Sequence, residues 1–345
     1  MKTSKRILVA IATVLFAGAN TSMSAKSWRI HNMAIYKPHF TSINDAMASE
    51  NVQDDDTLYL DPGSTISGTQ NVTKRVTIIG PGYFQKERLY GTSVISGYLY
   101  MKAANSKIEG VHLTSYLYIA ANEVTVERCR INRIDTSGNN AQNATIKQCH
   151  LNDNDGYIEG SGAESTVSSG WRIEGCILDS YNSSTINRLY CATIVHNYIR
   201  NRYSGNTNCI SNLSNSVIYD NIIHHSYNNK HNAVLGSLTN CSVTNNVLSC
   251  EEGTYTQYPQ NIYIGSSDFS QVLSLTNDDE FMLVDGSPAI NYATDGFDCG
   301  PTGGQYPYVS GGRPWGMPWY PTSIVANAPK DGKVNVNIKI QVQDE

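Results

Sequence analysis

Acidic, basic and imidazole side chains gather in five polar segments, and each segment follows a short apolar one. The segments read "NRIDTSGNN" (132–140), "NDNDGYIEGSG" (152–162), "DSYNSS" (179–184), "RNRYSGNTN" (200–208) and "HHSYNNKHN" (224–232). In chain order they supply Asp153, Asp155, Asp179, Arg200, Arg202, His224, His225 and Lys230. If the segments stack on one another, these side chains form one strip, acidic at one end and basic at the other.

Such a strip holds the groups that proton abstraction requires. Oxygen atoms of Asp153, Asp155 and Asp179 are the type of ligand that Ca²⁺ prefers, and a bound cation acidifies a proton next to a sugar carboxylate. His225 is a candidate base because imidazole titrates near neutral pH, and Lys230 is another. Solvated turns are the alternative, since polar turns on a repeat scaffold commonly contain Asp, Asn and Arg.

The apolar segments repeat one short pattern, as "VTVERCRI", "ATIKQCHL" and "WRIEGCIL" show. Aligned on one position, the copies place there Val111, Cys129, Cys149, Cys176, Asn197, Asn221 and Asn246, at intervals of 18, 20, 27, 21, 24 and 25 residues. Short β-branched segments without helical periodicity, at this spacing, predict strands that coil into the rungs of a solenoid. The intervals are too short for the four-stranded blades of a propeller.

Stacking explains why the pattern recurs. In a parallel coil, equivalent residues lie about 4.8 Å apart, so an inward Asn bonds to the Asn of the next rung. The sequence therefore predicts an Asn ladder, and it predicts that the polar strip is about 20 Å long.

Other segments carry a family resemblance. The stretches "HFTSINDAM", "DDTLYLDPGSTISGTQNVTKRVTIIGPGYF" and "VDGSPAINYATDGFDCGPTGGQYPY", together with the Asn-bearing rungs, resemble secreted proteins of the pectin-lyase-like superfamily, in the version common in Bacteroidetes. The resemblance covers residues 28 to about 310. It implies an all-β right-handed parallel β-helix with three strands per rung.

The same resemblance divides the chain. Residues 25–310 form the β-helix domain, in which residues 41–49 are the helix that caps the N-terminal end, with Thr41 or Ser42 near its N-cap. Residues 285–291, "DGSPAIN", form the closing rung. Residues 311–345 are a tail rich in Pro, Gly and aromatic residues that ends in a β-strand.

The resemblance also implies where substrate lies. Polysaccharides bind along a groove bordered by the polar segments, and a polysaccharide lyase of this fold often takes its base from Lys or Arg, here Arg200 or Arg202. His224 and Lys230 are expected to bind substrate. Hydrolysis has less support, because the Asn-Thr-Asp, Gly-His-Gly and Arg-Ile-Lys motifs of the family's hydrolases do not occur. Asp153 with Glu159 is the single carboxylate pair to consider.

The tail supplies two further expectations. Trp315 and Trp319 can stack on sugar rings, although rings buried against the solenoid are the alternative. Residues 334–342 alternate apolar and polar side chains, which predicts a half-buried strand. One strand is not stable alone, so we expect it to pair with the coil, with a second copy through residues 333–345, or with another protein.

The N-terminus and the composition limit location and partners. "MKTSKR" followed by "ILVAIATVLFAGA" is typical of a signal peptide, here residues 1–24, so we expect a secreted, periplasmic or cell-surface protein without an integral membrane segment. Without that segment the net charge is about −8, which argues against nucleic acid as a partner. The eight cysteines leave disulfide pairing open, and no zinc-binding spacing occurs.

Three functions fit these observations. We expect a non-catalytic glycan-binding or structural β-helix, because no recognisable catalytic set stands on the fold. The first alternative is a Ca²⁺-dependent lyase that acts on a uronate-containing glycan. The second is an adhesin or assembly component that uses its C-terminal strand.

Overall fold

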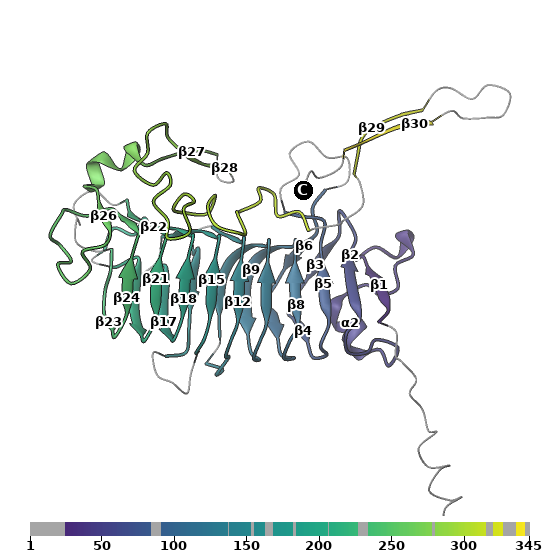
Figure 1. Ribbon diagram of the computed structural model, residues 1–345. Helices are drawn as coiled ribbons and strands as arrows, with labels where there is room; N and C mark the ends of the chain where they lie inside the picture. The colour runs from purple at the N-terminus through teal and green to yellow at the C-terminus, as the bar shows by residue number, and fades with distance from the viewer. Residues whose placement is uncertain are drawn as a thin grey trace, which may run out of the picture.

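The computed structural model describes residues 25–83, 91–136, 138–152, 155–162, 168–181, 184–205, 207–226, 234–277, 280–314, 320–326 and 336–341; the expected signal segment lies outside them. Short strands wind into an elongated solenoid, and every pairing along its two large sheets is parallel (Figure 1). Crossovers between parallel strands are right-handed for steric reasons. The chain is a right-handed parallel β-helix, which confirms the prediction from sequence.

A short helix closes the N-terminal end. The strand β1 (Ser27–Ile30) and the 3-10 helix η1 (Ala34–Tyr36) lead into α2 (Ile43–Ala48). Ser42 is the N-cap of α2, because its hydroxyl accepts a hydrogen bond of 3.1 Å from the backbone N–H of Asp45. The buried face of α2 covers the apolar core of the first rungs. No helix among the described residues has the length and apolar character needed to span a membrane.

The first sheet forms one flat wall of the solenoid and has one strand per rung. In spatial order its strands are β1, β2 (Thr57–Leu60), β5 (Thr77–Ile79), β8 (Lys107–Glu109), β10 (Thr125–Glu127), β12 (Thr145–Lys147), β15 (Arg172–Glu174), β18 (Thr193–Val195), β21 (Val217–Tyr219) and β24 (Ser242–Thr244). The central residue of each three-residue strand points inward and is buried, as at Val126 and Ile146.

The second sheet contains two columns that meet at a bend. The first column holds β3 (Thr65–Ser67), β6 (Val94–Ser96), the start of β9 (His112–Ile119), the start of β11 (Arg130–Asp135), β13 (His150–Leu151), β16 (Ile177–Ser180), β19 (Tyr198–Asn201), β22 (Ile222–His225), β25 (Val247–Leu248) and β26 (Ile262–Tyr263). The second column holds β4 (Gln70–Val72), β7 (Leu99–Met101), the ends of β9 and β11, β14 (Tyr157–Glu159), β17 (Ile186–Tyr190), β20 (Ile210–Ser214) and β23 (Leu238–Thr239). Each full rung thus has three strands.

The aligned Asn residues form the predicted ladder inside the turn between the first sheet and the first column. The side-chain amide of Asn197 donates to Asn221 Oδ1 at 3.0 Å, and Asn221 donates to Asn246 Oδ1 at 2.9 Å. Asn261, which the alignment missed, extends the ladder, because Asn246 donates to its Oδ1 at 2.9 Å. Cys129, Cys149 and Cys176 occupy the same position on earlier rungs, and all eight cysteines of the chain are free thiols.

The residue before each of the seven aligned positions, from Val111 to Asn246, has a left-handed backbone conformation. We call these residues the corner column; they are Gly110, Arg128, Gln148, Gly175, His196, Asp220 and Asn245, with φ between 51° and 66°. The left-handed residue makes the turn tight enough to bring the two sheets together while the next side chain points inward.

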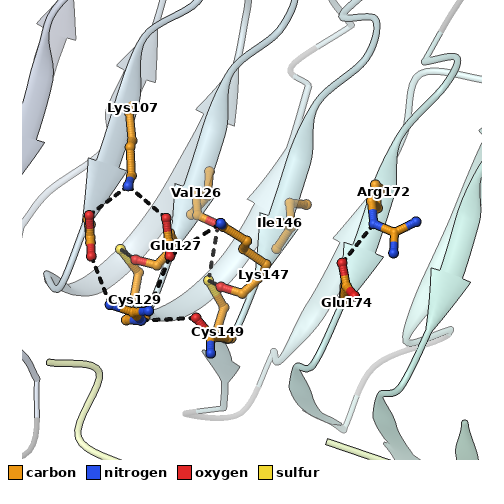
Figure 2. Close-up of polar contacts among 12 residues, drawn as sticks. Lys107, Val126, Glu127, Cys129, Ile146, Lys147, Cys149, Arg172 and Glu174 are labelled. Atoms are coloured by element: carbon orange, nitrogen blue, oxygen red, sulfur yellow. Dashed lines mark hydrogen bonds and ion pairs between the residues drawn. The ribbon is translucent and has the colours of Figure 1, made fainter. Parts of the chain in front are cut away.

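Charged side chains on the outer face of the first sheet form a second ladder. Lys107 lies 2.7 Å from the carboxylates of both Glu109 and Glu127, and Arg172 pairs with Glu174 at 2.7 Å (Figure 2). Arg128, fully buried at the corner, donates to Glu109 at 3.2 Å. Glu109 and Glu127 are register neighbours, and Lys107 and Arg128 supply the positive charges that keep these buried carboxylates paired.

After the last rung, the chain folds against the outside of the solenoid. The 3-10 helix η2 (Ser266–Gln271) and the antiparallel strands β27 (Leu273–Asn277) and β28 (Glu280–Leu283) pack over outward side chains of the first column. Residues 285–291 form turns in this outer layer, so their prediction as a closing rung is wrong. The reason is that Ala289 is buried in the outer apolar cluster and not in the core of the coil.

The next segment, residues 292–314, runs back along the corner column toward the N-terminal end, and we call it the strap (Figure 1). Gly300 donates to the carbonyl of Asp220 at 2.9 Å, and the carbonyl of Arg313 accepts from Arg128 at 3.2 Å. The carbonyl of Pro307 accepts from Gln148 between them. The strap therefore satisfies polar groups of a corner that would otherwise be open.

The expected C-terminal strand is present, but its partner differs from the three that we considered. Strand β30 (Val336–Gln341) pairs antiparallel with β29 (Tyr320–Ala326) of the same tail. A local hairpin closes a short loop, so this pairing has the smallest cost in loop-closure entropy. Trp315 and Trp319 lie outside the described residues.

Candidate functional site

The predicted strip is assembled in part. Asp179, Arg200 and His224 stand in register on the neighbouring strands β16, β19 and β22. Asp155 and Arg202 lie in the adjoining loops. Asp153 and Lys230 lie outside the described residues.

Asp179 is saturated by two arginines. Its carboxylate accepts a hydrogen bond of 2.8 Å from Arg200 Nε and a second one from the same guanidinium. It also lies 2.6 Å from Arg202 Nη2. The Arg202 guanidinium also stacks 3.8 Å from the ring centre of Tyr181. Burial alone would lower the pKa of Arg200, but the hydrogen bonds that it donates to Asp179 raise this pKa above its ordinary value. Arg200 therefore stays protonated, which suits anion binding and opposes action as a base.

The calcium ligands expected from sequence do not fit the ion. Both oxygens of Asp179 already accept from guanidinium groups, and two cations at this distance repel a third. Asp155 accepts a hydrogen bond of 3.0 Å from the hydroxyl of Tyr116. Among the described residues of the strip, no open set of oxygen ligands remains for Ca²⁺.

The two histidines have structural surroundings. His224 stacks on Phe269 with ring centres 4.2 Å apart, and its Nδ1 lies 3.1 Å from the hydroxyl of Tyr198. Burial, then the nearby Arg200 and His225, lower the pKa of His224 to about 3, so it is neutral at physiological pH. His225 points into the core because successive strand residues alternate between faces, and at 1% exposure it cannot reach a polymer outside. The expectations that His224 binds substrate and that His225 acts as a base are therefore not supported by their positions.

A tyrosine surface that the sequence analysis missed lies on the second column. Tyr98 and Tyr100 belong to one rung, and Tyr116 and Tyr118 belong to the next. The rings of Tyr100 and Tyr118 stack at 4.5 Å, Tyr98 lies 5.6 Å from Tyr116, and Lys102 Nζ lies 5.2 Å over Tyr100. We call these four rings the tyrosine platform. Its sequence signal is the repeat "YLY" at 98–100 and 116–118, whose spacing of 18 residues equals the first interval of the ladder.

Polar groups continue the platform along the solenoid. Arg133 is held between the rings of Tyr116 and Tyr157, at 4.9 and 4.4 Å, and it pairs with Asp135. Burial opposes the charge of Arg133, but Asp135 offsets that effect, and the pKa of the guanidinium is raised. The cation is thus fixed in place between two aromatic faces.

One register column connects the rings to these polar groups. Tyr100, Tyr118, Asp135, Glu159 and Asn187 are successive partners on β7, β9, β11, β14 and β17. Asn187 donates to Glu159 at 3.3 Å, and Asn212 donates to Asn187 at 2.9 Å. With strands about 4.8 Å apart, the column is about 20 Å long. It offers ring faces at one end and hydrogen-bonding groups at the other, which are the two features that sugar rings and hydroxyls require.

Comparison with known proteins identifies no family for this chain. No protein family and no curated protein matches its sequence. Among solved structures, the pectate lyase Pel9A aligns with a TM-score of 0.48 and 15% identity, over 81% of this chain and 96% of the lyase. A mannuronic acid specific polysaccharide family 6 lyase from human gut microbiota aligns with a TM-score of 0.34 and 16% identity, over 65% of this chain and 54% of that enzyme. The chain thus spans about half the length of the second enzyme.

Proposed function

We propose that the protein is exported and binds a polysaccharide without cleaving it, with the tyrosine platform as the main contact surface. The observation that carries the proposal is the group of four tyrosine rings on two adjacent rungs, of which Tyr98 is 43% exposed. Aromatic rings at a surface provide flat apolar area at a small cost in side-chain entropy, and sugar faces stack on such rings. A regular polymer matches a surface that repeats along a solenoid.

Binding has more support than catalysis because the charged groups beside the platform already have partners. Asp135 pairs with Arg133, while Glu159 accepts from Asn187 and lies 3.6 Å from Arg188. Arg200 and Arg202 share Asp179. Groups held in such pairs recognise hydroxyls and carboxylates, but they are poorly placed to exchange protons with a substrate.

The test is binding of the mature protein to a panel of neutral and uronate polysaccharides, by affinity electrophoresis and calorimetry. We expect Tyr100→Ala/Tyr118→Ala to weaken binding about tenfold or more, because each lost stacking contact is worth about 1 kcal/mol. Tyr306→Ala is the matched control, since Tyr306 is also exposed but lies on the strap over Lys147.

Ultraviolet absorbance of the same mixtures reports unsaturated products. An absorbance increase would show a lyase and contradict the non-catalytic function. Equal affinity of the double variant and the native protein would contradict the assignment to the platform.

A further inference from the structure

A histidine and two aspartates converge where the strap begins. His196 and Asp220 are consecutive members of the corner column, and Asp295 comes from the strap, 99 residues after His196. The Nε2 atom of His196 lies 3.0 Å from Asp295 Oδ2 and 3.8 Å from Asp220 Oδ2. Among the described residues, this is the one group of at least three potential metal ligands whose donor atoms all lie within 4.8 Å of one another.

Two of the three side chains are buried, and the group carries excess negative charge. His196 is 4% exposed and the Asp220 side chain is fully buried, whereas that of Asp295 is 37% exposed. Within the described part of the chain, neither carboxylate has a lysine or arginine partner. A divalent cation at this point would neutralise two carboxylates that face one imidazole.

The surrounding bonds orient the three side chains toward one point. Thr294 donates from its backbone N–H to Asp220 Oδ1 at 2.8 Å and from its hydroxyl to Oδ2 at 2.6 Å. The backbone N–H of Phe297 donates to Asp295 Oδ1 at 3.1 Å, which leaves Oδ2 directed at His196. The buried Nδ1 atom of His196 has no hydrogen-bond partner among the described residues. Nε2 is the ring atom that faces both carboxylates, and it can offer its lone pair to a cation when Nδ1 carries the proton.

The spacing and the donor types favour a transition metal over calcium. Ligands about 2.0–2.2 Å from a tetrahedral zinc lie roughly 3.4 Å apart, and the two distances from His196 fall on either side of this value. One imidazole with two carboxylates suits Zn²⁺ or a similar divalent ion, whereas Ca²⁺ takes oxygen ligands alone. The exposed side of Asp295 leaves room for water at the remaining position.

We propose that His196, Asp220 and Asp295 form a binding site for a divalent transition metal, with Zn²⁺ as the ion of choice, that fastens the strap to the solenoid. A cation at this point replaces the repulsion between the two carboxylates with attraction. The site forms only when the strap lies on the corner, so the binding free energy of the ion adds to the stability of the folded protein. The site is independent of the tyrosine platform.

The test uses the mature protein after dialysis against a chelator. Titration with ZnCl₂ in a calorimeter is expected to show one ion per chain, and Co²⁺ is expected to give the visible absorption of tetrahedral coordination. Asp295→Asn should weaken zinc binding at least tenfold and abolish the zinc-dependent rise in Tm. Asp298→Asn is the matched control, because this strap carboxylate accepts from Asn291 N–H and lies outside the group.

His196→Gln should have the same effect as Asp295→Asn, and the strap variant decides the question if the histidine variant does not fold. Absence of stoichiometric zinc binding, or equal binding by Asp295→Asn and the native protein, would overturn the proposal. Equal affinity for Ca²⁺ would overturn the choice of ion.

Discussion

At the scale of single residues, neighbours decide which charges are available for chemistry. Asp179 was expected to hold calcium and Arg200 to act as a base, yet each satisfies the other. Breaking such a buried pair leaves an uncompensated charge, whereas keeping it removes both groups from proton exchange. Burial also decides which residues can meet a ligand. The sequence favoured His225, but His225 is buried, whereas Tyr98 is exposed.

His224 provides a pH test at this scale. The unfolded chain protonates this residue near its ordinary pKa of 6.5, whereas the folded protein keeps it neutral down to about pH 3. Between these values the unfolded state binds more protons, so stability falls as the pH drops through this window. We expect His224→Phe, which keeps the stacking on Phe269, to reduce the stability loss between pH 7 and pH 5 by about 1–2 kcal/mol.

Urea unfolding of both proteins at the two pH values measures this difference. A loss of the same size in the variant would show that His224 is protonated in the folded protein.

At the scale of elements, the ladder holds the rungs in register. Asn221 is fully buried, and it accepts from Asn197 and donates to Asn246. It also donates to the carbonyls of Ile194 and Tyr219, so one side chain satisfies groups on three rungs. Cysteine can replace Asn on the earlier rungs, because the thiols of Cys129, Cys149 and Cys176 also donate weakly to backbone carbonyls.

Removing one ladder residue tests this role. We expect Asn221→Ala to lower the free energy of unfolding by about 3 kcal/mol, because it leaves several buried donors and acceptors without partners. Asn51→Ala, at an exposed position near the N-terminus, is the control and should change stability little. Denaturation followed by tryptophan fluorescence measures both. A loss below about 1 kcal/mol for Asn221→Ala would mean that water replaces the lost bonds.

At the scale of the whole molecule, the strap links the corners of several successive rungs, from Asp220 to Arg128. Gly312 has a left-handed φ of 57°, and a methyl group there would overlap the carbonyl of Arg128 and the ring of Tyr83. Gly296, with φ of 84°, has open space around it. Alanine at either site costs about 1 kcal/mol, because the backbone there is left-handed. Only at Gly312 does the added methyl group also force the strap away from the corner.

We therefore expect Gly312→Ala to make the strap markedly more sensitive to limited proteolysis, with Gly296→Ala close to the native protein. Mass spectrometry of the fragments locates the cleavage. Equal protection of the strap in both variants would show that the corner contacts do not hold it in place.

The repeat pattern of the sequence by itself determined the solenoid and the Asn ladder, whereas the three strands of each rung were implied by the family resemblance. These features depend on patterns that repeat at nearly constant spacing, and stacking requires each rung to match the next. The N-cap at Ser42 is likewise local, since the bond joins residues three positions apart.

The tertiary structure alone decided the strap, the His196–Asp220–Asp295 group and the partners of the candidate charges. Each of these brings together residues separated by many rungs or by a long loop, and no local pattern encodes such a meeting. The tyrosine platform lies between these cases. Its "YLY" repeat is visible in the sequence, but which face of the strand points outward is settled only when the rungs close around the core.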